Sequence, residues 1–225
     1  MINNSFELLC RLKEEDFLQI KKDPFWWPQS GTPKVIIGAI LTQQTKWERV
    51  EESLENLEEL GICSLEGIAD VGLSVLRKAI FPSGFYNMKA QRLKQLSKNI
   101  LETYGNFMTF QKSTDRKWLL SQKGIGMESA DSILCYACYR PIMVVDSYTN
   151  RLLVALGYTF DHYMDIQAWI HEGIEAHENR IVGLYKREIS LPEIYARFHG
   201  KIVEFSKEYI RGQKVDISLF DFSTM

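Results

Sequence analysis

The sequence predicts an all-α protein, because apolar residues recur at helical spacing along most of its 225 residues. Runs in which β-branched and polar residues alternate, which are typical of strands, are nearly absent, and Ile142–Val145 is the only short candidate. An apolar fraction of 45% and a charged fraction of 25% are typical of a globular chain with one or two domains. The composition therefore excludes a disordered or fibrous protein.

About ten helices are expected, and the spacing of the apolar residues locates the clearest of them. In chain order, these helices span residues 8–20, 33–45, 50–60, 73–80, 90–104 and 114–121. The helix over 33–45 contains a long apolar run and is expected to be buried. The helix over 50–60 is amphipathic and is expected to end at Gly61.

Proline-containing breaks at Asp23-Pro24 and Arg140-Pro141 divide the chain into two parts. The inner part covers residues 30–140, and the outer part combines residues 1–29 with residues 141–225. The short connections between helices leave no flexible linker. We therefore expect two helical domains that flank a cleft, where binding sites tend to form.

No segment is suited to crossing a membrane or to directing secretion. The longest apolar run, Val35–Leu41, has seven residues, whereas a spanning helix needs about 20. The start of the chain lacks a basic segment followed by an apolar one, so we expect a cytoplasmic protein with no membrane partner.

The cysteines and histidines give no support to a metal site. Four cysteines do not make a disulfide framework, and Cys135 and Cys138 are expected to be small core residues on one helix. The four histidines form no metal-binding motif. No metal is therefore expected.

The charges are unevenly distributed, although the net charge is only −2. Residues 46–70 carry eight acidic and two basic side chains, whereas residues 77–100 carry six basic side chains and no acidic one. A basic segment beside an acidic one can face a polyanion such as DNA while the other faces solvent. Taken alone, the pattern fits a merely solvated helix face equally well.

Residues 113–139 predict a helix–hairpin–helix. The first helix is expected to be capped by Ser113 or Thr114, and a hairpin follows at Gly124-Ile125-Gly126. Ala130, Ile133, Leu134 and Ala137 then lie on one face of a second helix. Two glycines let backbone N–H groups at a helix start approach a DNA phosphate without reading sequence. Lys123 is expected to bind DNA together with these N–H groups. A monovalent cation could also bind at the hairpin. The alternative interpretation is an ordinary αα-hairpin without a role in DNA binding.

Val144-Val145-Asp146 follows 20 residues after Gly126, and with the hairpin it resembles the endonuclease III superfamily of base-excision DNA glycosylases. The resemblance covers most of the chain. Segment 41–45 (Leu-Thr-Gln-Gln-Thr) resembles the family's first-helix motif, segment 84–90 its intercalation loop, and segment 198–201 the stretch that leads into its iron–sulfur loop.

This resemblance implies a six-helix barrel-type inner domain and a catalytic Asp146, which also fits a simple helix N-cap. It further implies that Phe85 wedges into the duplex and Gln44 fills the vacated gap. Lys89 and Arg92, from the basic segment, are expected to bind DNA phosphates.

Three departures from the family narrow the activity. Glu128 stands where strand-cutting members have a lysine that forms a Schiff base, and a carboxylate cannot form an imine. Ala39 stands where adenine-mismatch members have a catalytic glutamate. No cysteine follows Cys138, so no iron–sulfur cluster, and no other cofactor, is expected.

Phe25-Trp26-Trp27-Pro28, together with Trp47, resembles the bacterial 3-methyladenine DNA glycosylase subfamily. The resemblance places Trp26, Trp27, Pro28, Trp47 and Lys207 in a pocket for the alkylated base. N3-alkylated adenine is cationic, and an indole face favours a cation by about 0.5–2 kcal/mol over a neutral ring. Without the other motifs, core packing would explain the tryptophans better.

The sequence thus predicts a monomeric, monofunctional DNA glycosylase that flips out alkylated purines, chiefly 3-methyladenine, from double-stranded DNA and leaves an abasic site. Two alternatives stay open: a glycosylase of the same fold for oxidised or mismatched pyrimidines, and a non-catalytic helix–hairpin–helix module. Lys201 either reaches solvent or, if buried, needs a carboxylate partner or a covalent modification.

Overall fold

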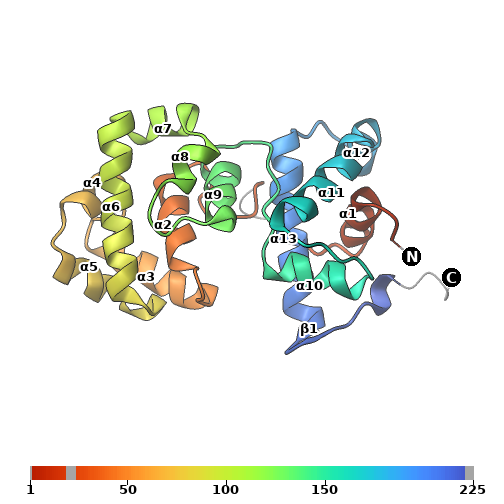
Figure 1. Ribbon diagram of the computed structural model, residues 1–225, viewed down its shortest axis with the longest axis horizontal. Coiled ribbons are helices and arrows are strands. Elements are labelled where there is room, and N and C mark those ends of the chain that lie inside the picture. Colours follow the sequence, from red (N-terminus) through yellow and green to blue (C-terminus); the bar gives the residue numbers. More distant parts are fainter. Residues whose placement is uncertain (1, 19–23, 221–225) are drawn as a thin grey trace. The chain divides into compact units, whose positions relative to one another are not determined.

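The computed structural model describes residues 2–18 and 24–220. The chain forms two compact units: Pro28–Tyr139, and Met1–Trp27 together with Arg140–Met225. Both units are built almost entirely of helices (Figure 1), which confirms the all-α fold. Within the described residues, the only strands are β1 (Ile210–Arg211) and β2 (Lys214–Val215), a short antiparallel pair that the apolar pattern did not predict.

The unit made from the two ends of the chain is organised around its last long helix. Its α-helices are α1 (Ser5–Glu14), α10 (Ser147–Ala155), α11 (Tyr163–Glu175), α12 (Glu178–Tyr185) and α13 (Leu191–Tyr209), and a 3-10 turn, η3 (Ser218–Phe220), follows the strands. Helix α13 contacts both α1 and α10. Leu8 and Leu12 of α1 share one apolar core with Phe198 and Phe205 of α13. This packing fixes α13 as the platform for the functional side chains described below.

The unit Pro28–Tyr139 is organised around α2, a helix that is buried from Val35 to Leu41. Its helices are α2 (Pro33–Leu41), α3 (Trp47–Glu59), α4 (Leu65–Asp70), α5 (Leu73–Ala79), η1 (Phe81–Ser83), α6 (Tyr86–Tyr104), α7 (Phe107–Ser113), α8 (Arg116–Leu120), α9 (Met127–Ser132) and the π-helical turn η2 (Ile133–Ala137). Helix α2 contacts α3, α6, α9 and η2 (Figure 1). The 19-residue α6 is the longest helix of this unit among the described residues.

Several helix ends differ from the sequence prediction. Helix α1 stops at Glu14, and Asp16 after it has left-handed backbone. The expectation that this helix continues is therefore wrong for residues 15–18. Residues 19 and 20 lie outside the described part of the chain. Helix α2 stops at Leu41 instead of residue 45. The first helix of the hairpin motif is capped by Asp115, whose side chain accepts a hydrogen bond from the Trp118 N–H, so the caps expected at residues 113 and 114 are wrong.

Cys135, Cys138 and Lys201 are buried. Cys135 and Cys138 are free and buried, in η2 and directly after it, as expected for core residues. Lys201 in α13 is 1% exposed, which excludes the solvent-reaching alternative, and burial lowers the pKa of its ammonium to about 8. The described residues hold no group of three His, Cys, Asp or Glu side chains suited to a metal ion. No helix in the described ranges is long and apolar enough to cross a membrane.

Candidate functional site

Asp146 is fixed at the start of α10 by its own capping contacts. Its Oδ1 accepts hydrogen bonds from the backbone N–H and the hydroxyl of Thr149, each 2.8 Å long. The residue is therefore the N-cap that one reading of the sequence suggested. The cap uses only one carboxylate oxygen, which leaves Oδ2 for other contacts.

The segment before Asp146 is extended but is not a strand, which corrects the expectation for residues 142–145. Side chains of α11 satisfy its backbone in place of a neighbouring strand. The N–H of Met143 donates to Nε2 of His171, and the Nε2 group of Gln167 donates to the carbonyl of Met143. The N–H of Val145 donates to the hydroxyl of Tyr163. These contacts hold the chain in a defined path up to Asp146.

His199 lies beside the second oxygen of Asp146. Its Nε2 is 3.5 Å from Oδ2, and its side chain, on α13, is 5% exposed. Burial by itself would raise the pKa of Asp146, but the contacts with His199 and Thr149 outweigh burial and hold this pKa below its usual value. Asp146 is consequently ionised at neutral pH, and its side chain, 14% exposed, lies next to an imidazole.

Replacing His199 with Phe should raise the pKa of Asp146, because the ring packing is kept while the imidazole contact is lost. His199→Gln, which keeps an N–H donor, should leave this pKa closer to that of the unchanged protein. Titration of the Asp146 carboxyl by NMR measures both variants. An unchanged pKa in His199→Phe would show that Thr149 alone keeps Asp146 ionised.

Trp26 packs closely against α13 at Gly200. A Cβ atom on Gly200 would lie 2.5 Å from Cγ of Trp26, so a larger residue at this position would displace the indole. The indole also makes an edge-to-face contact with His199, with ring centroids 5.4 Å apart. Trp26, His199 and Asp146 thus form a continuous series of contacts within one unit.

Glu204 joins Trp26 to Lys207. Its Oε1 accepts a hydrogen bond of 3.0 Å from the indole Nε1 of Trp26 and lies 2.8 Å from Nζ of Lys207. Sequence reasoning missed both Glu204 and His199. The sequence did contain a pattern that indicates Glu204. Gly200, Glu204 and Lys207 follow the i, i+4, i+7 spacing that puts side chains on one helix face.

The remaining pocket candidates divide between the two units. Trp27 is buried and meets Trp26 edge to face, with centroids 6.3 Å apart, so the structure brings Trp26, Trp27 and Lys207 together. Pro28 is exposed and Trp47, the first residue of α3, is half-buried; both belong to the unit Pro28–Tyr139.

Of the two glycines in the hairpin between α8 and α9, Gly124 has left-handed backbone that favours glycine, whereas Gly126 is extended. Gly124 has a φ of +87°, and Gly126 is the N-cap of α9. The carbonyls of Gln122 and Gly124 already accept hydrogen bonds, from the Ile125 N–H and the Gln43 side chain respectively. A cation at the hairpin stays a prediction.

Gln43 and Arg92 brace the hairpin from the side. The Nε2 group of Gln43 donates to the carbonyl of Gly124 (2.9 Å) and to the hydroxyl of Ser129 (3.1 Å). Arg92 donates to Oε1 of Gln43, and a Cβ on Gly124 would lie 2.4 Å from Nε of Arg92. Gln43 was not identified from the sequence. It connects the motif after α2 directly to the hairpin.

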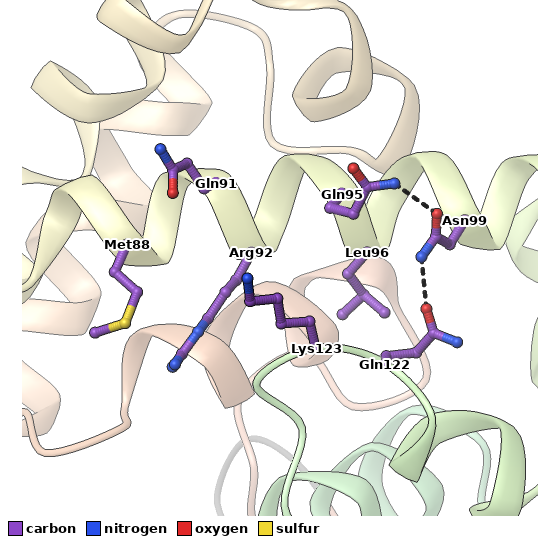
Figure 2. Close-up of a pocket in the computed structure, with 8 residues that line it drawn as sticks. All are labelled: Met88, Gln91, Arg92, Gln95, Leu96, Asn99, Gln122 and Lys123. Atoms are coloured by element: carbon purple, nitrogen blue, oxygen red, sulfur yellow. Dashed lines mark hydrogen bonds between the residues drawn. The ribbon is translucent and has the colours of Figure 1, made fainter.

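A groove lined by polar, charged and apolar side chains runs between α6 and the hairpin (Figure 2). Its volume is about 380 Å³, and it is lined by Met88, Gln91, Arg92, Gln95, Leu96, Asn99, Gln122 and Lys123. Hydrogen bonds from Gln95 to Asn99 and from Asn99 to Gln122 satisfy the amides at one end. The other end carries the two cations, Arg92 and Lys123, and suits a phosphate group.

Gln44 and Phe85 are both exposed residues with left-handed backbone. Gln44 has a φ of +54° in the turn after α2, and Phe85 has a φ of +46° as the N-cap of α6. Phe85 is 60% exposed. Non-glycine residues adopt this conformation at a cost, and such residues cluster at functional sites.

Lys89 does not face solvent, so its assignment to the phosphate-binding surface is wrong. The side chain is 2% exposed, and its ammonium donates three hydrogen bonds to Leu41, Thr45 and Ser83. Burial lowers its pKa to about 8. Counting charges in residues 77–100 could not distinguish this buried lysine from exposed ones.

Both a family model and a similar protein connect this chain to DNA repair. Residues 37–174 match the family model for HhH-GPD superfamily base excision DNA repair proteins, and this range contains Gln44, Phe85, the hairpin and Asp146. A protein of Methanocaldococcus jannaschii, provisionally described as a DNA repair glycosylase, is 36% identical over 217 residues, which cover 94% of this chain and 92% of that protein.

Solved structures extend the comparison. One of them is the crystal structure of an H. pylori 3-methyladenine DNA glycosylase bound to 1,N6-ethenoadenine. Its sequence is 45% identical to this chain, and the two structures superpose with a TM-score of 0.89 over 93% of this chain and 100% of that one. A non-covalent endonuclease III–DNA complex is 18% identical with a TM-score of 0.70, over 97% of this chain and 94% of that one. The latter similarity supports the fold alone.

Proposed function

Because the chain belongs to the HhH-GPD superfamily of base excision DNA repair proteins, we propose that it is a monofunctional glycosylase that releases alkylated purines, chiefly 3-methyladenine. That it is a DNA glycosylase of base excision repair follows from the family; the substrate and the lack of strand cutting are the proposal. One observation carries it: Asp146 contacts His199, and His199 contacts Trp26. A carboxylate and an electron-rich ring are thereby held in one series of contacts.

The unit Pro28–Tyr139 would bind and open the duplex. A base inside the stack is out of reach of a catalytic group, so it must be flipped out, and a damaged base costs least to extrude. Phe85 is exposed enough to enter the stack, and Gln44 would fill the gap. Lys123, Arg92 and the Gly124–Gly126 backbone would hold phosphates.

The tryptophans would select the base. N3-alkylated adenine carries a positive charge, and stacking on an indole stabilises a cation by about 0.5–2 kcal/mol. Trp26 supplies such a ring, the buried Trp27 supports it edge to face, and by resemblance Trp27, Pro28 and Trp47 share this role. Lys207 would repel a cationic base, but Glu204 pairs with it and leaves the pair close to neutral. The name of the H. pylori relative, a 3-methyladenine DNA glycosylase, supports the same substrate.

Asp146 would carry the reaction. The N-glycosidic bond breaks through a state in which positive charge develops on the sugar, and an ionised carboxylate stabilises that charge. The same group would orient or deprotonate the water that attacks C1′. An alkylated base is already a good leaving group, so little acid catalysis is needed. The product is an abasic site.

Strand cutting is not expected, because Glu128 occupies the position of the family's Schiff-base lysine. Glu128 lies in the first turn of α9. A carboxylate cannot attack C1′ to form an imine, so the abasic product should be released intact.

Incubating the protein with methylated DNA and identifying the free bases by chromatography tests the proposal. We expect 3-methyladenine as the main product, because its cationic ring suits the indole cluster. Addition of borohydride during the reaction should trap no covalent protein–DNA adduct. Duplexes with an oxidised pyrimidine or a mismatched thymine serve as matched substrates.

Each other outcome points to a different activity. If the protein releases an oxidised or mismatched pyrimidine but no 3-methyladenine, its substrate is a pyrimidine lesion and not an alkylated purine. DNA binding without release of any base would indicate a non-catalytic module. A strong trapped adduct would show that some amine replaces the missing lysine.

A further inference from the structure

The buried ammonium of Lys89 connects two separate loops. Lys89 lies in the first turn of α6, and its Nζ donates to the carbonyl of Leu41, the hydroxyl of Thr45 and the carbonyl of Ser83, at 2.7 Å in each case. The hydroxyl of Thr45 also lies 2.6 Å from the carbonyl of Ser83. An ammonium group has three N–H donors, so all of them are used.

Each loop carries one exposed residue with left-handed backbone. Gln44 lies between Leu41 and Thr45, and Phe85 lies two residues after Ser83. Both have positive φ values, and left-handed backbone at such residues persists only where the surroundings hold it. The acceptors of Lys89 are thus the residues that flank Gln44 and precede Phe85.

We propose that Lys89 is a positioning residue for base extrusion: its ammonium fixes the Gln44 turn and the Phe85 loop relative to each other, so that both enter the duplex together. This inference rests on the proposed function, in which these two residues invade the DNA. Charge-assisted hydrogen bonds to three acceptors set both loops before DNA arrives, which spares the complex the entropy cost of ordering them.

A neighbouring lysine provides a matched control. Lys94, on the same helix, donates to the carbonyls of Ala69 and Val71 at 2.6 and 2.5 Å. It therefore connects α6 to the end of α4 through the same chemistry. Loss of Lys94 should weaken the fold without changing the Gln44 turn or the Phe85 loop.

The test uses the full chain and a duplex with 2-aminopurine beside a tetrahydrofuran abasic analogue, because unstacking raises 2-aminopurine fluorescence. Lys89→Met should lower both this fluorescence rise and the single-turnover release of bases from a separate, methylated duplex by about tenfold or more, since charged hydrogen bonds are lost. Affinity for undamaged DNA should stay within about twofold, because phosphate contacts remain. Lys94→Met should keep the fluorescence rise despite lower thermal stability.

If Lys89→Met fails to fold, Thr45→Val removes one of the three acceptors more mildly and should give a smaller loss of the same kind. A full fluorescence rise in Lys89→Met, or in a folded Thr45→Val with unchanged base release, would overturn the inference. So would an equal loss in Lys94→Met. The fluorescence reports loop insertion whichever base is removed, so an unchanged protein that inserts but releases no alkylated base would contradict the proposed function alone.

Discussion

Asp146→Asn should lower the single-turnover release of 3-methyladenine by about 10²- to 10³-fold or more, the range seen when a preorganised electrostatic group is removed. The substitution removes the negative charge that would stabilise the developing sugar cation. Affinity for lesion-containing DNA should stay equal or rise, because the phosphate contacts are untouched. Rapid-quench excision assays and equilibrium binding measure the two effects separately.

Asp146→Asn should remove the negative charge without disturbing the local structure. The side-chain oxygen of Asn can still accept the two hydrogen bonds from Thr149, so the cap of α10 and the thermal stability should be kept. The pKa of Asp146 lies below its usual value, so the rate of the unchanged protein should fall only at a pH below the range in which an ordinary aspartate titrates. Near-normal excision by Asp146→Asn would remove this residue from the mechanism.

The helices could be predicted from the sequence because their apolar spacing is regular, but the end of α2 could not. Helix α2 stops at Leu41, and Gln44 takes a left-handed conformation that its residue type does not signal. The contacts that flank this turn come from Lys89, far along the chain. Local spacing cannot report a turn that depends on a distant ammonium group.

In the candidate site, too, some residues could be predicted from the sequence and others could not. Asp146 and the hairpin were identified because their residue types and spacing resemble a family motif. His199 and Glu204 were missed because their roles depend on packing: Trp26 and Glu204, for example, are 178 positions apart. Only the folded position of α13 brings these side chains to one place.

Trp26→Ala should lower the single-turnover release of 3-methyladenine by about 5- to 150-fold, because stacking on a flipped base contributes about 1–3 kcal/mol. Trp26→Phe should lose less, since it keeps an aromatic face. Gly200→Ala should also reduce release, although residue 200 need not touch the substrate, because the new Cβ would lie 2.5 Å from Cγ of Trp26 and displace the ring.

Salt dependence separates this loss of selectivity from a loss of DNA binding. The tryptophan and glycine variants should leave the slope of log affinity against log salt unchanged, because they remove no cation. Lys123→Gln removes one of the two cations at the groove and should flatten that slope by nearly one unit, for damaged and undamaged DNA alike. If Trp26→Ala excises 3-methyladenine at the unchanged rate, the indole cluster is core packing, and the case for a cationic alkylated base loses its main physical support.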